Sequence, residues 1–348
     1  MLYVYTLFWL LLATKIQAQV NLDPPITYWI DTSCAGHVDE TTFDEVRLMA
    51  AEGNRLLAAG DEIFSTAFQK VFRTGINNVE AVTKVKQAFN KIETIKPSSG
   101  ATDIAFKQSD IRIYCDNDNR WELIPDKIGG RKVGGKKPIK NSKKPAEEQA
   151  WWDPMNFIYR PTGSYGCQDR EGQTLAQTYK TKDEGLSDLG LKAGHVARRE
   201  VITVCNYVLD SEDPILLSGF TVSKDLTGML KGTPKNQVLN MQDLSELVSL
   251  TIFHELCHTT DILNIPGHKS EILGWTGEQG IMTSQLDLAG LLNEADSFAL
   301  LGLSAVLNRR NIRLSKEDEA ATLGKLEFIN PPTETTNHIR IRQMRFTA

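Results

Sequence analysis

The chain has 348 residues, of which 41% are hydrophobic and 24% are charged, and its formal net charge is −5. A chain of this length can bury one large core or two modest ones, and its average composition excludes a wholly disordered protein. The negative net charge argues against nucleic acid as the main partner. Beyond the N-terminus there is no apolar run long enough to cross a membrane, so we expect no membrane association after processing.

The first residues, "MLYVYTLFWLLLATKIQAQ", read as a secretory signal peptide over residues 1–18. An apolar run ends in small residues that suit cleavage after Ala18, although the usual basic start is missing. The alternative is a short membrane anchor, for which the run is too short. The predicted localisation is therefore secreted and extracellular.

Two long helices are predicted in the N-terminal part of the chain. Residues 39–59 open with acidic and Thr capping candidates and continue with apolar residues at helical spacing. Residues 78–93 show a second helical pattern. Two β-branched stretches that each carry a cysteine, 110–118 and 200–208, predict strands.

Residues 129–149, "GGRKVGGKKPIKNSKKPAEEQ", are rich in Lys and Gly and nearly free of apolar side chains. Such a segment is typical of a solvated, flexible insertion, and the alternative is an anion-binding patch or a processing site. We expect one domain over residues 19–328, with this insertion inside it, and an extended C-terminal tail over 329–348. Helices and strands that follow one another without regular βαβ alternation favour the α+β class.

The cysteines fit an exported protein. Four of them are widely spaced without a CxxC pair, which predicts two disulfides rather than a cysteine metal site; they are Cys34, Cys115, Cys167 and Cys205. Their pairing stays open at this point. The fifth, Cys257, is expected to be a small buried residue.

The chemistry is concentrated in "TIFHELCHTTDIL", residues 251–263, which contains an HExxH motif. Apolar residues at helical spacing lead into it from a cap candidate at Asp243 or Ser245. Residues four apart lie on one face of a helix, so His254 and His258 can share one Zn²⁺. Glu255 would then lie beside the metal, where a carboxylate can move the proton of the attacking water.

A zinc site of this kind needs a third protein ligand, for which there are four candidates. His268 and Glu278 lie in turn-like stretches, and Glu294 and Asp296 lie in a predicted helix over 291–307. On that helix Asp296 falls roughly 70° from the centre of the apolar stripe and Glu294 roughly 130°. Asp296 is thus predicted at the edge of the core, where a buried carboxylate needs a metal or a partner. The alternative role is interaction with exposed amides at the helix start.

"HELCH", followed by "GW" and then by "NEADSFALL", resembles the pattern of the deuterolysin or aspzincin family of zinc metalloendopeptidases, which includes the peptidyl-Lys metalloendopeptidases. The resemblance covers roughly residues 200–307 and implies a zincin-like fold with the metal-site core in that range. It implies His254, His258 and Asp296 as ligands of one Zn²⁺ per chain and Glu255 as the catalytic carboxylate. Protein or peptide substrates are implied with it.

The chain departs from the family pattern within "SEILGWTGEQG", residues 270–280. Leu273 stands where tyrosine is usual, and Ser270 stands at the place of an aspartate with Glu271 beside it. The predicted function is a secreted zinc metalloendopeptidase in which Glu255 acts as general base and acid. The altered segment motivates the alternative, a secreted zinc-binding protein of impaired activity, such as a surface antigen or a metal scavenger.

Overall fold

The computed structural model describes residues 24–123, 127–128, 131–132, 151–156, 158–160, 167, 174–180, 200–209, 240–245, 247–267, 271–276 and 280–329. The predicted signal peptide, nearly all of the predicted basic insertion and all but the first residue of the predicted tail lie outside these residues. So do two of the candidate third ligands, His268 and Glu278.

The described residues form helices around a small mixed sheet, which is compatible with the predicted α+β class. The helical elements are η1 (Thr32–Cys34), α2 (Glu40–Ala59), α3 (Glu62–Phe72), α4 (Val79–Glu93), α5 (Thr102–Gln108), α7 (Asn206–Leu209), α9 (Val248–His258), α10 (Leu288–Leu291), α11 (Ala295–Arg309) and α12 (Asp318–Thr322). Within the described ranges, no helix is long and apolar enough to cross a membrane.

The central sheet has the strand order β2-β1-β3-β10-β9, and its strands are β1 (Thr27–Ile30), β2 (Lys96–Pro97), β3 (Ile111–Tyr114), β9 (Ala176–Lys180) and β10 (Glu200–Val204). All of its pairs are parallel except the last, in which β9 runs antiparallel to β10. Smaller sheets contain β4 (Glu122–Leu123), β7 (Trp151–Asp153) and β8 (Ile158–Arg160), then β5 (Lys127–Ile128) and β6 (Arg131–Lys132), and finally β11 (Ile312–Leu314) and β12 (Leu326–Phe328).

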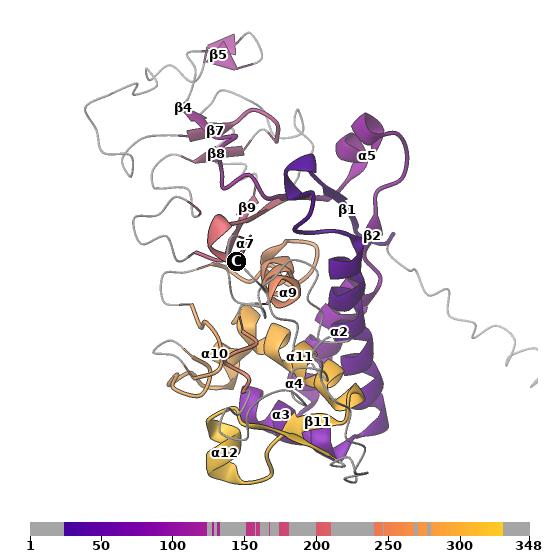
Figure 1. The fold of residues 1–348 in the computed structure, drawn as a ribbon, viewed down its shortest axis with the longest axis vertical. Coiled ribbons are helices and arrows are strands. Elements are labelled where there is room, and N and C mark those ends of the chain that lie inside the picture. Colours follow the sequence, from indigo (N-terminus) through magenta and orange to yellow (C-terminus); the bar gives the residue numbers. More distant parts are fainter. Residues whose placement is uncertain are drawn as a thin grey trace, which may run out of the picture.

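The central sheet is covered on both faces. In β3, Ile111 and Ile113 face the large core built with the helices, and Tyr114 faces a second cluster that contains Trp121 and Ile158. This alternation follows from the period of two in a strand. Figure 1 shows α9 next to the sheet, the long helices α2 and α11 beyond it, and the β4-β7-β8 sheet on the opposite side.

The two predicted N-terminal helices are confirmed, and so is an acidic cap on the first of them. Asp39 caps α2 in a capping box with Thr42, and Gly60 ends it in the left-handed conformation at φ 62°. Asn78 caps α4 by accepting a hydrogen bond from Ala81 N. These signals depend only on neighbours in sequence, which is why the sequence sufficed to place both helices.

Both cysteine-bearing strands are shorter than predicted. β3 ends at Tyr114 because the chain turns at Asn117 and Asp118, whose φ angles are 50° and 60°. β10 ends at Val204, and the residues after Cys205 form the short helix α7 instead of continuing the strand.

The starts of the two helices that carry the motif differ from the prediction. α9 begins at Val248, and neither predicted cap residue caps it, because Asp243 accepts from Asn240 N and Ser245 donates to Gln242 O within the preceding turn. α11 begins only at Ala295, with Glu294 at its N-cap position. Glu294 is buried (3% exposed), so its predicted place on the polar side is wrong. A helical angle does not apply to a residue that precedes the helix.

The expected two disulfides are present as Cys34–Cys115 and Cys167–Cys205. Cys257 is free and fully buried, as predicted for a small core residue. The two bonds are consistent with an extracellular protein.

Candidate metal centre

Helix α9 brings the two histidines of the HExxH motif together. It is almost completely buried between the sheet and α11, and its last turns carry His254 and His258 on the same face. Their Nε2 atoms lie 3.0 Å apart, and their exposed fractions are 7% and 5%. The prediction that His254 and His258 lie on one face of a helix is thus confirmed.

The other ring nitrogen of each histidine has an oxygen partner. His258 Nδ1 lies 3.0 Å from the carbonyl oxygen of Ile265, in the turn that follows α9. His254 Nδ1 lies 2.5 Å from Oδ1 of Asp296. A carbonyl oxygen and a carboxylate can only accept, so both Nδ1 atoms carry the proton and both Nε2 atoms are turned toward a shared point.

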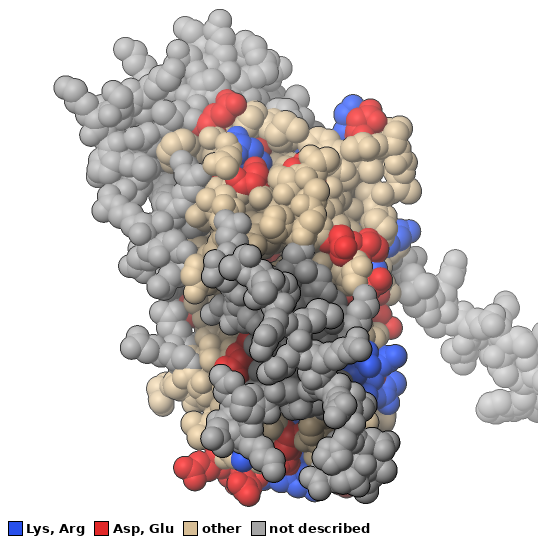
Figure 2. All heavy atoms as spheres, in the orientation of Figure 1, with Lys and Arg blue, Asp and Glu red and all other residues tan. Residues whose placement is uncertain are grey.

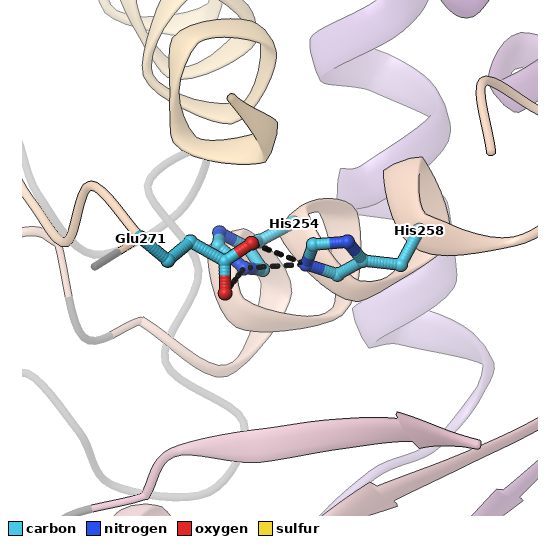
Figure 3. Close-up of side chains that lie close together, drawn as sticks. All are labelled: His254, His258 and Glu271. Atoms are coloured by element: carbon cyan, nitrogen blue, oxygen red, sulfur yellow. Dashed lines mark hydrogen bonds and ion pairs between the residues drawn. The ribbon is translucent and has the colours of Figure 1, made fainter. Parts of the chain in front are cut away.

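Glu271 supplies the third potential ligand at that point. Its Oε1 lies 3.1 Å from His258 Nε2, and its Oε2 lies 3.9 Å from His254 Nε2. Figure 3 shows its carboxylate reaching in from the loop after α9 toward both rings. The ligand atoms of these three residues all lie within 4.8 Å of one another, so the group could hold a metal ion.

Sequence reasoning missed Glu271, noting it only as the neighbour of Ser270. Asp296 was chosen instead, and the structure places it at Nδ1 of His254 rather than among the converging ligand atoms. Its role as a ligand stays a prediction. The signal that could have found Glu271 is a carboxylate just before Gly274-Trp275, close enough to α9 in sequence to fold back on it.

The loop that carries Glu271 is held by three side chains from other elements. Glu294 Oε2 accepts from Ile272 N at 3.1 Å, and Asp296 Oδ2 accepts from Gly274 N at 2.5 Å. Gln242 Oε1 accepts from the two following backbone amides, at 2.7 and 2.8 Å. A loop without helix or strand hydrogen bonds needs such partners for its buried amides, and here they also set where Glu271 points.

Carboxylates around His254 change its protonation. Burial by itself lowers the pKa of His254, but Asp296 at 2.5 Å, with Glu255 and Glu271, outweighs it and raises the pKa to about 10. At neutral pH the ring is therefore an imidazolium in the absence of metal, and its Nε2–H can donate to His258 Nε2. Burial also raises the pKa of the Cys257 thiol on the same helix, so it stays protonated.

Glu255 is buried next to this group, with 5% of its surface exposed. Its Oε2 accepts a hydrogen bond of 2.6 Å from Thr178 Oγ1, and its backbone oxygen lies 3.0 Å from the same hydroxyl. Thr178 is the middle residue of β9, so the last strand of the described sheet orients this carboxylate.

The chain matches no protein-family model, and searches of curated proteins and of solved structures found no match either. What this centre does must therefore be inferred from its own residues.

Proposed function

We propose that the protein is a secreted zinc metalloendopeptidase in which His254, His258 and Glu271 hold the metal. One observation carries the proposal. Two imidazoles and a carboxylate converge within 4.8 Å, and a further buried carboxylate, that of Glu255, follows the first histidine directly in sequence.

The donor set suits zinc. Two neutral imidazole nitrogens with one carboxylate oxygen are the protein ligands of many catalytic zinc sites, in which the fourth position is left to water or substrate. A bound zinc ion polarises a carbonyl and lowers the pKa of water. Hard oxygen-preferring ions such as Mg²⁺ and Ca²⁺ would be poorly served by two imidazoles.

Glu255 has the properties of the proton carrier in such a reaction. A carboxylate beside the attacking water accepts its proton and later delivers it to the leaving amine nitrogen. This transfer requires a fixed position, and the hydrogen bond from Thr178 provides it. A zinc-binding protein without catalysis would need the three ligands but not Glu255.

The resemblance to the deuterolysin family supports the same function and suggests a zincin-like fold. The proposed ligand set differs from the one that the resemblance implies, because Glu271 takes the place of Asp296 as the third ligand. Glu271 lies beside Ser270, which stands at the place of an aspartate in the family pattern. The two disulfides support export into an oxidising compartment.

A second candidate is a secreted zinc-binding protein that no longer cleaves peptides. Leu273, where the family has tyrosine, is 47% exposed and carries no polar group with which to assist a reaction. The metal ligands would be the same in both cases, so only turnover separates the two functions.

The test compares zinc-loaded wild type, with both disulfides formed, with Glu255→Gln on a diverse peptide library and on a denatured protein. The wild type is expected to cleave. Glu255→Gln is expected to lose at least about a hundredfold in kcat/KM, because general acid–base catalysis is removed. Both should bind about one zinc per chain. If the wild type binds zinc but cleaves nothing, the peptidase proposal is wrong and the second candidate stands. Glu271→Gln is the control for zinc binding, because it removes a proposed ligand and should weaken zinc affinity.

A further inference from the structure

Asp296 makes two contacts that lead to different parts of the metal centre. Its Oδ1 lies 2.5 Å from Nδ1 of His254, and its Oδ2 accepts from the backbone amide of Gly274 at 2.5 Å. The residue is 7% exposed and lies in the first turn of α11. One buried carboxylate thus touches both a histidine of α9 and the loop of Glu271.

We propose that Asp296 is a positioning residue that couples the orientation of His254 to the position of the Glu271 loop. The inference rests on the proposed metal site but not on its catalytic activity. It assigns Asp296 a role at the metal centre other than that of a ligand.

The two histidines are oriented in different ways, and this difference makes Asp296 important. His258 Nδ1 is paired with the carbonyl oxygen of Ile265, only a few residues further along the chain. His254 Nδ1 depends on a side chain 42 residues away, on another helix. Loss of Asp296 would therefore release one of the two rings while leaving the other held.

Only a carboxylate satisfies both neighbours. The imidazole Nδ1–H and the Gly274 N–H are both donors, and each Asp296 oxygen accepts one of them. An asparagine of the same size has one oxygen and one NH₂ group, so one of the two donors would face another donor. Substitution by asparagine breaks one link whichever way the amide turns.

Glu294 offers a matched control in the same segment. It lies two residues before Asp296, is buried, and accepts from Ile272 N in the same loop. Glu294→Gln replaces the carboxylate that accepts a hydrogen bond from Ile272 N in the loop, and it leaves the contact between Asp296 and His254 in place. The comparison separates a general loosening of the loop from loss of the histidine contact.

The experiment measures zinc affinity by competition with a chromophoric chelator, together with the visible spectrum of the Co²⁺-loaded protein. The proteins are the wild type, Asp296→Asn, Glu294→Gln and Glu271→Gln. Removing a carboxylate that orients a metal-binding histidine weakens metal binding by about 10- to 100-fold. We expect this loss in Asp296→Asn with a Co²⁺ spectrum like that of the wild type. Glu294→Gln, whose amide oxygen can still accept from Ile272 N, should lose less zinc affinity than Asp296→Asn, and Glu271→Gln should change the spectrum.

Several results would overturn the inference. Equal affinity of Asp296→Asn and wild type would show that the contact orients nothing. A changed Co²⁺ spectrum in Asp296→Asn, like that of Glu271→Gln, would make Asp296 a ligand. An equal loss in Glu294→Gln would assign the effect to the loop alone. A wild type that binds no zinc would instead refute the proposed function.

If Asp296→Asn does not fold, the wild type itself still tests the inference by NMR with ¹⁵N-labelled histidine. The His254 signals are assigned with the His254→Gln variant. On addition of zinc, the Nε2 signal of His254 should shift as this atom binds the metal, while Nδ1 keeps its proton beside Asp296. Loss of the Nδ1 proton would show that the metal takes the Asp296 position.

Discussion

Thr178 holds Glu255 with a single hydroxyl, 2.6 Å from Oε2 and 3.0 Å from the backbone oxygen. A threonine hydroxyl has one proton, so the carboxylate and the carbonyl share it. The shorter contact is the one to the carboxylate, which identifies Thr178 as the residue that fixes the orientation of Glu255.

Thr178→Val removes this hydroxyl and keeps the shape of the side chain. A lost hydrogen bond to a charged group costs about 1.5–3 kcal/mol, so kcat/KM should fall by about tenfold or more, while zinc affinity stays unchanged. Thr178→Ser retains the hydroxyl and should keep most of the activity. The measurement is kcat/KM for peptide cleavage by the wild type and the two variants. Equal values for Thr178→Val and the wild type would show that Thr178 does not orient Glu255.

Gly274 is required by its backbone and by its surroundings. Its φ of +77° is one that residues with a side chain rarely adopt, and an added Cβ would lie 2.7 Å from the amide of Gln242. Gln242 cannot simply move away, because its Oε1 accepts from Trp275 N and Thr276 N.

Gly274→Ala should therefore displace the Glu271 loop, at a cost of about 1–3 kcal/mol, and weaken zinc binding markedly. Gly60→Ala is the matched control, since Gly60 also has positive φ but nothing lies within 4 Å of its added Cβ. The control should lose stability without losing zinc affinity. Zinc titration and thermal unfolding of both variants provide the comparison; unchanged zinc affinity in Gly274→Ala would mean that the loop tolerates the shift.

Between elements, α2 and α11 are joined by an ion pair at the edge of the core. Glu52 of α2 contacts Arg55 on its own helix at 2.6 Å and Arg309 of α11 at 2.5 Å. Burial alone would raise the pKa of Glu52, but the two arginines outweigh it and hold the pKa below the ordinary 4.5. Both arginines are about half exposed, so solvent screens the interaction.

Glu52→Gln should lower the free energy of unfolding by about 1 kcal/mol at neutral pH. Because the folded pKa of Glu52 is depressed, its contribution is fully present above 4.5 and is lost as the pH falls through the folded pKa. The difference between variant and wild type should therefore shrink in acid. Urea unfolding over a pH series measures it, and a difference that stays constant into acid would contradict the ion-pair account.

On the second face of the sheet, a buried arginine plays a structural role. Arg120 contacts Asp116 at 2.7 Å, Asp153 at 2.8 Å and Thr203 at 2.7 Å, and it stacks over Tyr114 at 4.3 Å. These contacts join the turn after β3 to β7 and β10. A buried charge with this many partners is satisfied, and it needs no further ligand to explain it.

For the whole molecule, the Cys34–Cys115 bond closes the longest covalent loop, with a sequence separation of 81. The loop contains α2, α3, α4 and α5. Cross-linking so many residues reduces the entropy of the unfolded chain, which for this length corresponds to about 4 kcal/mol.

The double substitution Cys34→Ala and Cys115→Ala should lower the free energy of unfolding by about that amount. The Cys167–Cys205 bond closes a shorter loop, with a sequence separation of 38. Its removal should therefore lower the free energy of unfolding by somewhat less. Guanidinium unfolding of the two double variants gives the comparison. A loss below about 1 kcal/mol for the first would show that the unfolded chain is already compact.

Among the described residues on the face drawn in Figure 2, acidic and basic side chains lie close together in several places. One ion pair joins Lys70 of α3 to Asp318 of α12 at 3.0 Å. A mixed surface of this kind suits the modest net charge of −5.

The sequence by itself determined the features that depend on near neighbours. The two N-terminal helices, the cap at Asp39 and the placement of His254 and His258 on one helix face all follow from spacings within a few residues. The number of disulfides followed from the cysteine count. The burial of Asp296 agrees with its predicted place, but the apolar stripe did not decide it, because Ser297 and Ser304 on the predicted polar side are buried as well.

Only the tertiary structure decided which carboxylate meets the two histidines. Glu271 lies in a loop without periodicity, and its place is set by Gln242, Glu294 and Asp296, which reach it from segments more than twenty residues away. The pairing of the cysteines and the contact of Thr178 with Glu255 are likewise long-range. Sequence patterns report local preference, whereas a loop side chain is positioned by partners that only the folded chain brings near.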